Sequence, residues 1–499
     1  MLCYAPKEMS MWDAWFVEDR DWVHAFHLQK LAKQSSQAPG SADWIGHARS
    51  RDLVRWEQLP SALGPGAAGG DDDMQPWTGC VVAHEGTYYL YYTMRSTASR
   101  GMKQRIGLAT SADLMTWRRH GGNPIIEPDE RWYVGYGKPL DCGVVDCRDL
   151  VVVRDGDRWL GFYATMRPAA EFSEMGTIAC VESHDLIHWT HLPPAFAPGR
   201  YSVLEVPDVF ELDGAWYMTC LAGHRYGNRG FFSDPNVGHG TIYAVSDRPE
   251  GPYLENHTDN VLIGSTVTGY SCRSIVYEGQ RHLLYIQPGT DHDTLSPPML
   301  VKAPSPGKLR LGWSDRQETF RKQSLVPSDG GGQVRLLAAT SNWLQPSGTW
   351  TCSKGTYRGR CHTGWQVVEV GAGAALLEVE VTVDLQDAFA AGIVFRCDCS
   401  RPYCSPTDLA FLAEPGSQTV RATSLPVFGD PVVRVCALRP GSRVSLRLIV
   451  REEWFELYVD NILLLESFLE KPPAVSPGIG LLVDRGNATF SNLHAFQLG

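Results

Sequence analysis

The sequence predicts an all-β protein, a five-bladed β-propeller followed by a C-terminal β-sandwich. Three observations point to this fold class: a short motif that recurs through the N-terminal part, an aromatic-rich strand that recurs five times between its copies, and period-two alternation of apolar residues in the C-terminal part. Amphipathic helical periodicity of useful length is missing from residues 1 to about 325. Closing five similar units into a ring removes the exposed sheet edges that invite aggregation.

The first observation is the motif Ser-x-Asp-Leu-x-x-Trp. Three full copies and one degenerate copy begin at Ser50, Ser111, Ser183 and Ser246. Their separations of 61 to 72 residues are typical of a propeller or an array, because strand signals dominate each unit. The repeated aspartates, such as Asp52, have the same neighbours in non-equivalent units. We therefore interpret them as turn-capping residues of the fold.

The second observation is the recurring aromatic strand. It is predicted over residues 22–29, 87–93, 158–165, 215–220 and 281–287. Turn residues such as Asp155 and Gly156 come directly before these strands. Five strands of one kind indicate five units, and each unit reads as four strands that end in the repeated motif.

The third observation separates a second domain. Residues 328–334 contain Ser-Asp-Gly-Gly-Gly, a cluster typical of a linker. Beyond it, residues 375–383 and 444–451 alternate with period two, which indicates half-buried antiparallel strands of a β-sandwich. We therefore predict a propeller domain over residues 1–327, the linker, and a sandwich domain over residues 335–499.

Composition argues against several classes of partner. The net charge of −11 and the lack of a basic stripe argue against nucleic acid, and no stretch approaches the about 20 apolar residues of a membrane span. The N-terminal segment lacks the apolar run of a signal peptide, so we expect a cytoplasmic protein, with secretion left open if the sequence is trimmed. We interpret the 13 cysteines as free thiols rather than as a disulfide ladder or a zinc site.

The repeat also places residues at the propeller axis. The first strand of each blade lines this axis and should end about ten residues before the aromatic strand. Reading back from each aromatic strand gives the segments 11–13, 77–80, 147–149, 205–208 and 270–273. Three of these segments carry the acids Asp13, Asp149 and Glu205. An isolated aspartate often caps a turn, but acids at three matching blade positions are expected to converge on one polar pocket.

Converging carboxylates suit the cleavage of a glycosidic bond. One carboxyl group protonates the leaving oxygen, and another attacks the sugar or activates water. Crowded negative charge and partial burial should raise the pKa of the acid toward the working pH.

At these residues the sequence resembles family 32 of the glycoside hydrolases, the group of invertases, levanases and inulinases, over nearly the whole chain. The segment 44–60 is the most specific match, because it looks like the family's W-G-H-A-x-S-x-D-L-x-x-W. Asp13 and Gln29 keep the family's separation between the Asp of W-M-N-D-P-N-G and the Gln of H-L-F-Y-Q. The segments 77–80, 147–150 and 205–210 are similar to W-S-G-S, F-R-D-P and E-C-P-D-L-F.

The resemblance implies a β-fructofuranosidase-like hydrolase that removes terminal furanosyl groups from a fructoside or oligosaccharide by a retaining mechanism. Asp13 would be the nucleophile, Glu205 the general acid and then base, and Asp149 the residue that holds sugar hydroxyls. Arg148 should keep Asp149 ionised, whereas the apolar neighbours of Glu205 favour its protonated form. The implied sugar contacts are Trp12, Gln29, Trp44, Trp77, Arg148 and Arg273. The resemblance implies no metal and no cofactor.

The segment after Asp13 departs from the family pattern, since Ala-Trp-Phe stands where P-N-G is expected. This loop shapes the pocket for the terminal sugar, so an arabinofuranoside or a galactofuranoside is an alternative substrate. An inverting mechanism, in which Asp13 activates water, is also open. A propeller that binds carbohydrate without catalysis is a third alternative, although such a site would not need all three acids. A scaffold for protein partners would not need acids at the axis at all.

Overall fold

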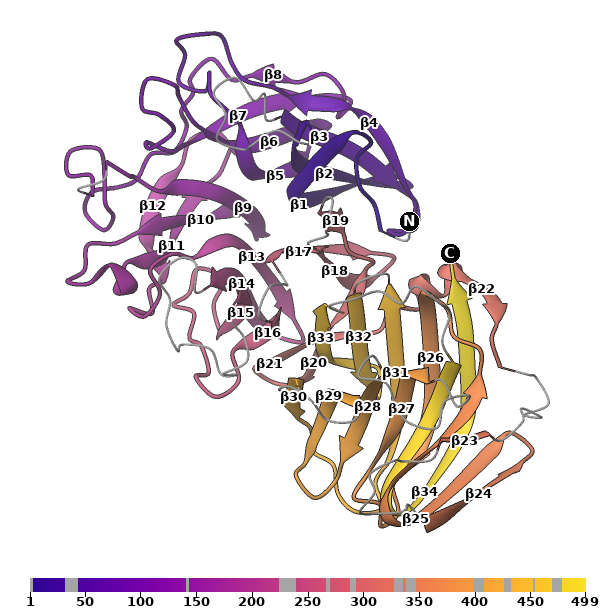
Figure 1. Cartoon of the computed structure of the whole chain (residues 1–499). Coiled ribbons are helices and arrows are strands. Elements are labelled where there is room, and N and C mark those ends of the chain that lie inside the picture. The colour runs from indigo at the N-terminus through magenta and orange to yellow at the C-terminus, as the bar shows by residue number, and fades with distance from the viewer. Residues whose placement is uncertain are drawn as a thin grey trace. The chain divides into compact units, whose positions relative to one another are not determined.

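A computed structural model of the chain describes residues 3–31, 44–140, 143–223, 239–265, 270–287, 293–326, 335–337, 347–397, 408–425, 432–451, 454–468 and 478–499. The chain divides into two compact units, Cys3–Leu311 and Gly312–Gly499 (Figure 1). The predicted linker, residues 328–334, lies outside the described residues. The predicted domain boundaries therefore stay predictions.

The N-terminal unit contains four separate sheets of four antiparallel strands, and in each sheet the strands pair in sequence order. The first two sheets consist of β1 (Met9–Asp19), β2 (Trp22–Leu31), β3 (Trp44–Ser50) and β4 (Trp56–Leu63), and of β5 (Trp77–His84), β6 (Thr87–Met94), β7 (Arg105–Ser111) and β8 (Arg118–Arg119). The next two consist of β9 (Cys147–Asp155), β10 (Arg158–Met166), β11 (Gly176–Ser183) and β12 (Thr190–Phe196), and of β13 (Glu205–Leu212), β14 (Ala215–Gly223), β15 (His239–Ser246) and β16 (Val261–Ser265). A short 3-10 helix, η1 (Phe172–Glu174), precedes β11.

Five further strands complete this unit. They are β17 (Tyr270–Tyr277), β18 (Gln280–Gln287), β19 (Thr294–Leu295), β20 (Met299–Ser305) and β21 (Lys308–Gly312). They pair in sequence order, but the sheet topology does not separate them as a four-stranded sheet of their own. The topology therefore shows an all-β propeller with four distinct blades and leaves the predicted fifth blade unconfirmed.

The predicted aromatic strands are the second strands of these groups, which confirms that part of the sequence interpretation. The repeated aspartates cap turns as expected. In the first copy, the Asp52 carboxylate accepts hydrogen bonds from the backbone N–H groups of Val54 and Arg55, at 2.9 and 2.7 Å. Leu53, which precedes them, is fully buried in a left-handed conformation, with φ of 63°. Asp113 and Asp185 make the same pair of bonds in their own turns.

The C-terminal unit is a β-sandwich-like assembly, as predicted. One long strand, β34 (Gly478–Leu498), pairs with β27 through Ile479–Asp484 and with β26 through Thr489–Gln497, and so belongs to two layers. The other elements are η3 (Asp315–Phe320), β22 (Arg321–Ser324), β23 (Arg335–Leu337), β24 (Ser347–Ser353), β25 (Thr356–Gly371), β26 (Leu376–Asp384), β27 (Ala390–Cys397), β28 (Asp408–Glu414), β29 (Thr419–Leu425), β30 (Val432–Val435), β31 (Arg443–Arg451), β32 (Trp454–Val459) and β33 (Ile462–Phe468).

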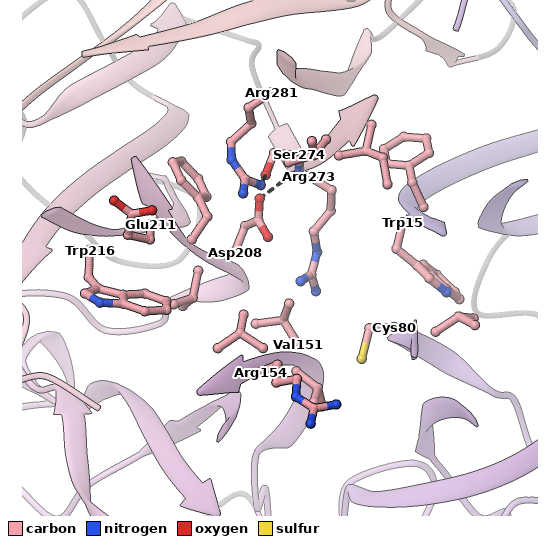
Figure 2. Close-up of a pocket in the computed structure, with 18 residues that line it drawn as sticks. Trp15, Cys80, Val151, Arg154, Asp208, Glu211, Trp216, Arg273, Ser274 and Arg281 are labelled. Carbon is pink, nitrogen blue, oxygen red and sulfur yellow. Dashed lines mark hydrogen bonds between the residues drawn. The ribbon is translucent and has the colours of Figure 1, made fainter. Parts of the chain in front are cut away.

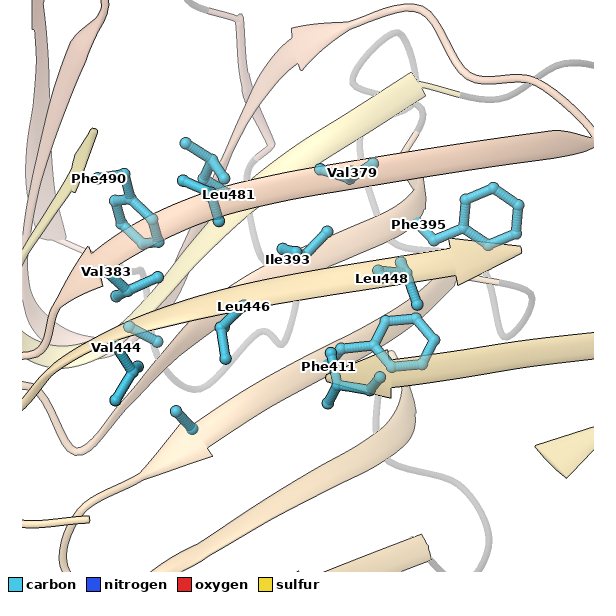
Figure 3. Close-up of a cluster of buried hydrophobic side chains, with 14 of the residues drawn as sticks. Val379, Val383, Ile393, Phe395, Phe411, Val444, Leu446, Leu448, Leu481 and Phe490 are labelled. Carbon is cyan, nitrogen blue, oxygen red and sulfur yellow. The ribbon is translucent and has the colours of Figure 1, made fainter. Parts of the chain in front are cut away.

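Apolar side chains from both layers form one core in this unit. Val379 and Leu446 come from β26 and β31, and Ile393 and Phe411 come from β27 and β28 (Figure 3). The rings of Phe411 and Phe455 meet edge to face with centroids 5.0 Å apart. Burying alternate side chains of two sheets against each other is how a sandwich is stabilised. Within the described ranges, no helix has the length and apolar character needed to span a bilayer.

Candidate active site

Five inner strands lie side by side around the axis of the N-terminal unit. β1 contacts β5, β5 contacts β9, β9 contacts β13, β13 contacts β17, and β17 contacts β1 (Figure 1). Each of these five strands also shifts register against its partner near its beginning. A β-bulge of this kind re-aims side chains and is common next to active sites. The sequence-predicted axial segments therefore lie at five equivalent bulges.

Four of the bulges contain a residue with left-handed backbone conformation. These residues are Asp13, Asp149, Val206 and Ser271, with φ of 39°, 63°, 46° and 55°. None is glycine, and a β-branched residue such as Val206 rarely adopts this conformation. Such backbone strain costs on the order of 1–3 kcal/mol per residue and persists only where the surrounding structure imposes it. Three of the strained positions coincide with the candidate acids or their direct neighbours.

Asp13 lies in the bulge of β1, and its carboxylate joins three inner strands. Thr78 of β5 donates a hydrogen bond to Asp13 Oδ2, and Ser271 of β17 donates one to Asp13 Oδ1. Burial raises the pKa of Asp13, and the nearby Glu205 carboxylate adds to the increase. The two hydroxyl hydrogen bonds and the Arg273 guanidinium oppose it, because they favour the ionised form.

Asp149 lies in the bulge of β9 and is almost fully buried. Its Oδ2 accepts a hydrogen bond from the backbone N–H of Val206 on β13 at 3.0 Å. Arg148 Nε is 3.5 Å from the same oxygen. Burial nevertheless raises the pKa of Asp149 to about 7, and the Asp13 and Glu205 carboxylates contribute to the increase. Arg148 does not keep the pKa of Asp149 in the ordinary range of a carboxyl group, contrary to the expectation, because desolvation outweighs this one partly shared cation.

Glu205 begins β13 and keeps partial exposure of its side chain. Its Oε1 accepts a hydrogen bond from Arg148 Nη2 at 3.1 Å. Arg148 also contacts Asp146 Oδ1 through Nη1 at 2.6 Å, so one guanidinium faces Asp146, Asp149 and Glu205 together. Arg148 thus links Asp149 and Glu205, and the Asp13 carboxylate is close enough to interact electrostatically with both.

The predicted sugar contacts on the first blade occupy adjacent strands. Gln29 of β2 pairs in register with Met11 of β1 on one side and with Trp44 of β3 on the other. Gln29 is buried, and its amide donates a hydrogen bond to Ser61 at 2.9 Å. Trp12 and Trp44 are half-buried. The structure therefore brings Trp12, Gln29 and Trp44 to one blade, which also carries Asp13.

The predicted contacts Trp77 and Arg273 differ from each other. Trp77 begins β5 and is half-buried, with the Arg95 guanidinium stacked 3.6 Å from its ring centroid. Arg273 lies on β17, beyond the bulge, and is almost fully buried. Its Nη2 donates a hydrogen bond to the backbone carbonyl of Asp149 at 3.1 Å. Arg273 thus supports the backbone that carries Asp149.

Among the described residues, no group of three or more His, Cys, Asp and Glu side chains is arranged to hold a metal ion. Cys361 of the C-terminal unit is a free thiol. Cys399 and Cys404 lie outside the described residues.

Comparison with known proteins identifies the family. The model of the glycosyl hydrolases family 32 N-terminal domain matches residues 15–273, just over half of the chain. The chain belongs to glycoside hydrolase family 32. The match contains Asp149 and Glu205 and begins shortly after Asp13, where the sequence departs from the family pattern.

Relatives of this family 32 chain agree with that result. A levanase from Bacillus sp. (strain L7) is 25% identical over 491 residues, which cover 90% of this chain and 48% of the levanase. This chain therefore spans about half the length of that relative. A solved β-fructofuranosidase from Bombyx mori, with 16% identity, superposes with a TM-score of 0.69 over 100% of this chain and 93% of its own. The fructan 1-exohydrolase IIa from Cichorium intybus, with 15% identity, gives 0.68 over 100% and 96%. These two likenesses show the fold.

Sequence reasoning missed the residues that hold the acids of this family 32 chain in place. Gln104 accepts a hydrogen bond from Arg148 at 3.1 Å, and Asp146 forms the shortest of the ion pairs to Arg148. Thr93 Oγ1 accepts from the backbone N–H of Asp149 and donates to the carbonyl of Thr78, at 3.1 and 2.8 Å. The only signal for Asp146 was a second acid near Arg148 in the segment Asp-Cys-Arg-Asp.

The pKa of Asp149 leads to a pH-dependent stability. Its pKa is raised from 3.8 to about 7, so the folded chain keeps a proton that the unfolded chain loses between about pH 4 and 7. This contribution is fully present below about pH 4 and is lost as pH rises through about 7. We expect the stability of the wild type relative to Asp149→Asn to fall by about a few kcal/mol across this window. Urea unfolding at a series of pH values measures it.

The matched control is Asp113→Asn. Asp113 caps an exposed turn, and backbone hydrogen bonds lower its pKa instead of raising it. The stability of the wild type relative to Asp113→Asn should not fall across the same pH window. A flat difference for Asp149→Asn would show that Asp149 titrates alike in the folded and unfolded chains.

Proposed function

We propose that this chain hydrolyses terminal β-fructofuranosyl linkages by a retaining double displacement. The observation that carries the proposal is the clustering of Asp13, Asp149 and Glu205 on neighbouring inner strands of a family 32 propeller. Two carboxyl groups on either side of a glycosidic bond are what this reaction needs, and the third can hold sugar hydroxyls.

Asp13 is the proposed nucleophile. Its attack on the anomeric carbon requires an ionised carboxylate, and the hydrogen bonds from Thr78 and Ser271 favour that form. The same two bonds fix the orientation of the carboxylate, since each oxygen has one donor. The bond from Asp13 to the sugar forms as the bond to the leaving oxygen breaks.

Glu205 is the proposed acid and base. It gives a proton to the leaving oxygen in the first step and takes one from water in the second. The Arg148 guanidinium contacts the carboxyl groups of Asp146, Asp149 and Glu205. Arg148 also fixes the position of Glu205 through Oε1.

The relatives support the substrate class. The levanase is named for its action on levan, and solved neighbours include a Bombyx mori β-fructofuranosidase with sucrose and the Cichorium intybus exohydrolase with 1-kestose. All are fructosides. The half-buried Trp12, Trp44 and Trp77 offer apolar ring surface for the sugar, and Gln29 and Arg148 offer hydrogen-bond donors.

We further propose that the propeller has five blades and that β17, β18, β20 and β21 form the fifth. Contacts of β17 with both β13 and β1 support this, because they close the ring of inner strands. Ser271 of β17 also donates to Asp13 of β1, so the fifth blade supplies part of the site. A location in the cytoplasm stays a prediction from the sequence.

The substrate prediction is tested with a panel of sucrose, inulin, levan, and aryl arabino- and galactofuranosides. We expect released fructose from at least one fructoside and no release from the other furanosides. Activity on arabinosides or galactosides alone would contradict the substrate class and leave the family assignment intact.

The variant Glu205→Gln distinguishes an enzyme from a propeller that binds carbohydrate without catalysis. We expect turnover of the best substrate to fall at least about 10³-fold, because proton transfer to an unactivated leaving group is lost. Sugar affinity, measured by titration calorimetry, should stay within a few-fold of the wild type. Equal turnover in the variant and the wild type would remove Glu205 from the mechanism.

The role of the Asp13 hydrogen bonds is tested by Thr78→Val. Losing this donor removes stabilisation of the Asp13 carboxylate, so its pKa should rise by about one unit or more. The acidic limb of the kcat/KM profile, which reports the ionised nucleophile, should then move to higher pH. The control is Thr219→Val, because Thr219 is equally buried and its hydroxyl has no hydrogen-bond partner among the described residues. Identical acidic limbs in Thr78→Val and the control would contradict this role.

A further inference from the structure

Arg148 is paired with more acids than the proposed reaction uses. Its Nη2 is 3.1 Å from Glu205 Oε1, and its Nε is 3.5 Å from Asp149 Oδ2. The third acid, Asp146, lies just before β9, and its Oδ1 is 2.6 Å from Arg148 Nη1, the shortest of the three ion pairs. Within the described part of the chain, these are the acids at ion-pair distance from Arg148. The proposed reaction assigns roles to Asp149 and Glu205 and none to Asp146.

Asp146 is held in place away from solvent. Only 5% of its surface is exposed, and only 6% of the surface of Arg148. The Asp146 carbonyl accepts a hydrogen bond from Thr165 Oγ1 of β10 at 2.8 Å, which fixes its backbone. Gln104 Oε1 also accepts from Arg148 Nη1, at 3.1 Å, so this nitrogen has an acceptor for each of its two hydrogens. Desolvation offsets much of the attraction in so buried an ion pair, so net stabilisation of the fold is a weak explanation for it.

The charge of Asp146 reduces the positive charge that Arg148 presents to its other partners. Burial opposes the charged form of Arg148, but the surrounding acids outweigh burial and raise its pKa. Among these acids Asp146 has the largest effect, before Glu205 and Asp149. A guanidinium carries one positive charge, so a carboxylate at Nη1 offsets part of the attraction felt at Nη2 and Nε. The offset is strong here because buried charges are screened little by salt and water.

Other charged groups lie near this cluster without an ion pair to Arg148 among the described residues. They are Asp13, Glu127, Asp208, Arg273 and Arg281. The last three line a cavity of about 430 Å³ along the inner strands, and neither Asp146 nor Arg148 lines it (Figure 2). Arg273 reaches Asp149 through a hydrogen bond to its backbone carbonyl. Substituting Asp146 leaves all of these charges in place.

We propose that Asp146 is a positioning residue of the site, which acts through Arg148 and limits the positive charge that reaches Asp149 and Glu205. With Asp146 ionised, Arg148 favours the charged forms of these two acids less than an unshared guanidinium would. Glu205 has to hold a proton before it can give it to the leaving oxygen, so a partly neutralised guanidinium suits this step. The part that concerns Glu205 rests on the proposed function, whereas the part that concerns Asp149 does not.

The first test follows Asp149 and needs no substrate. Asp146→Asn keeps an oxygen that can accept the hydrogen bond from Arg148 Nη1 and removes the charge. Arg148 should then lower the pKa of Asp149 from its value of about 7. The stability that Asp149 contributes, measured against the same chain with Asp149→Asn, should therefore stop falling at a pH at least about half a unit lower than in the wild type. Urea unfolding at a series of pH values measures this end point, and identical end points would overturn the proposal.

Gln104→Glu is the opposite change, because it adds a carboxylate where the amide oxygen now accepts from Arg148 Nη1. It should move the same end point to higher pH, and combined with Asp146→Asn it should bring the end point back toward the wild type. It also decides the question if Asp146→Asn does not fold, since an end point that Gln104→Glu leaves unmoved would overturn the proposal. The control Asp129→Asn removes the acid of another ion pair, with Arg131 at 2.5 Å, and should leave the end point unchanged.

The second test is the pH profile of kcat/KM on the best fructoside. Its basic limb reports the proton on the general acid, so Asp146→Asn should move this limb to lower pH by about half a unit or more, and Gln104→Glu should move it to higher pH. A merely structural role for Asp146 would lower kcat/KM and leave both limbs in place, which would overturn the proposal. If the wild type releases no fructose from any fructoside, the proposed function fails, and the end points of Asp149 alone decide the role of Asp146.

Discussion

Hydrogen bonds between the axial carboxylates and the neighbouring inner strands are the interactions on which the site depends. Asp13 of β1 accepts from Thr78 of β5 and from Ser271 of β17. Asp149 of β9 accepts from the backbone of β13, and its carbonyl accepts from Arg273 of β17. The proposed reactive groups therefore also cross-link the strands that surround the axis. Substituting them changes the packing of the blades as well as the chemistry, so activity and stability have to be measured together.

This arrangement has two unfavourable features, strained backbone conformations and a carboxyl group removed from water. Non-glycine residues hold left-handed conformations at four of the five bulges, and Asp149 is buried with a pKa of about 7. Both features are unfavourable for folding alone and are typical of sites in which function outweighs local stability. The buried Arg148, shared by three carboxyl groups, links the two effects, because it holds the acids close while leaving their charge only partly compensated.

Local chemistry determines the parts of the molecule that could be predicted from the sequence. Asp52 and its repeats cap turns because Asp followed by Leu in a left-handed conformation satisfies the backbone within a few residues. The axial segments were found because they keep a fixed spacing from the aromatic strands. The spacing of residues along the sequence does not reveal the register in which neighbouring strands pair. The bulges around Asp13 and Val206, and the partners Gln104 and Asp146, arise from contacts between strands far apart in the chain. The raised pKa of Asp149 could not be predicted from the neighbouring Arg148, because burial is a tertiary property.

The proposed mechanism depends on a covalent bond between Asp13 and the sugar. Glu205→Gln treated with β-fructosyl fluoride tests it most directly, because fluoride leaves without an acid and the missing base then slows hydrolysis of the intermediate. Intact-mass and peptide-mass spectrometry should show a hexosyl adduct on the peptide that contains Asp13, absent from Asp13→Asn. Fluoride release without any adduct, or an adduct on another carboxylate, would contradict this mechanism.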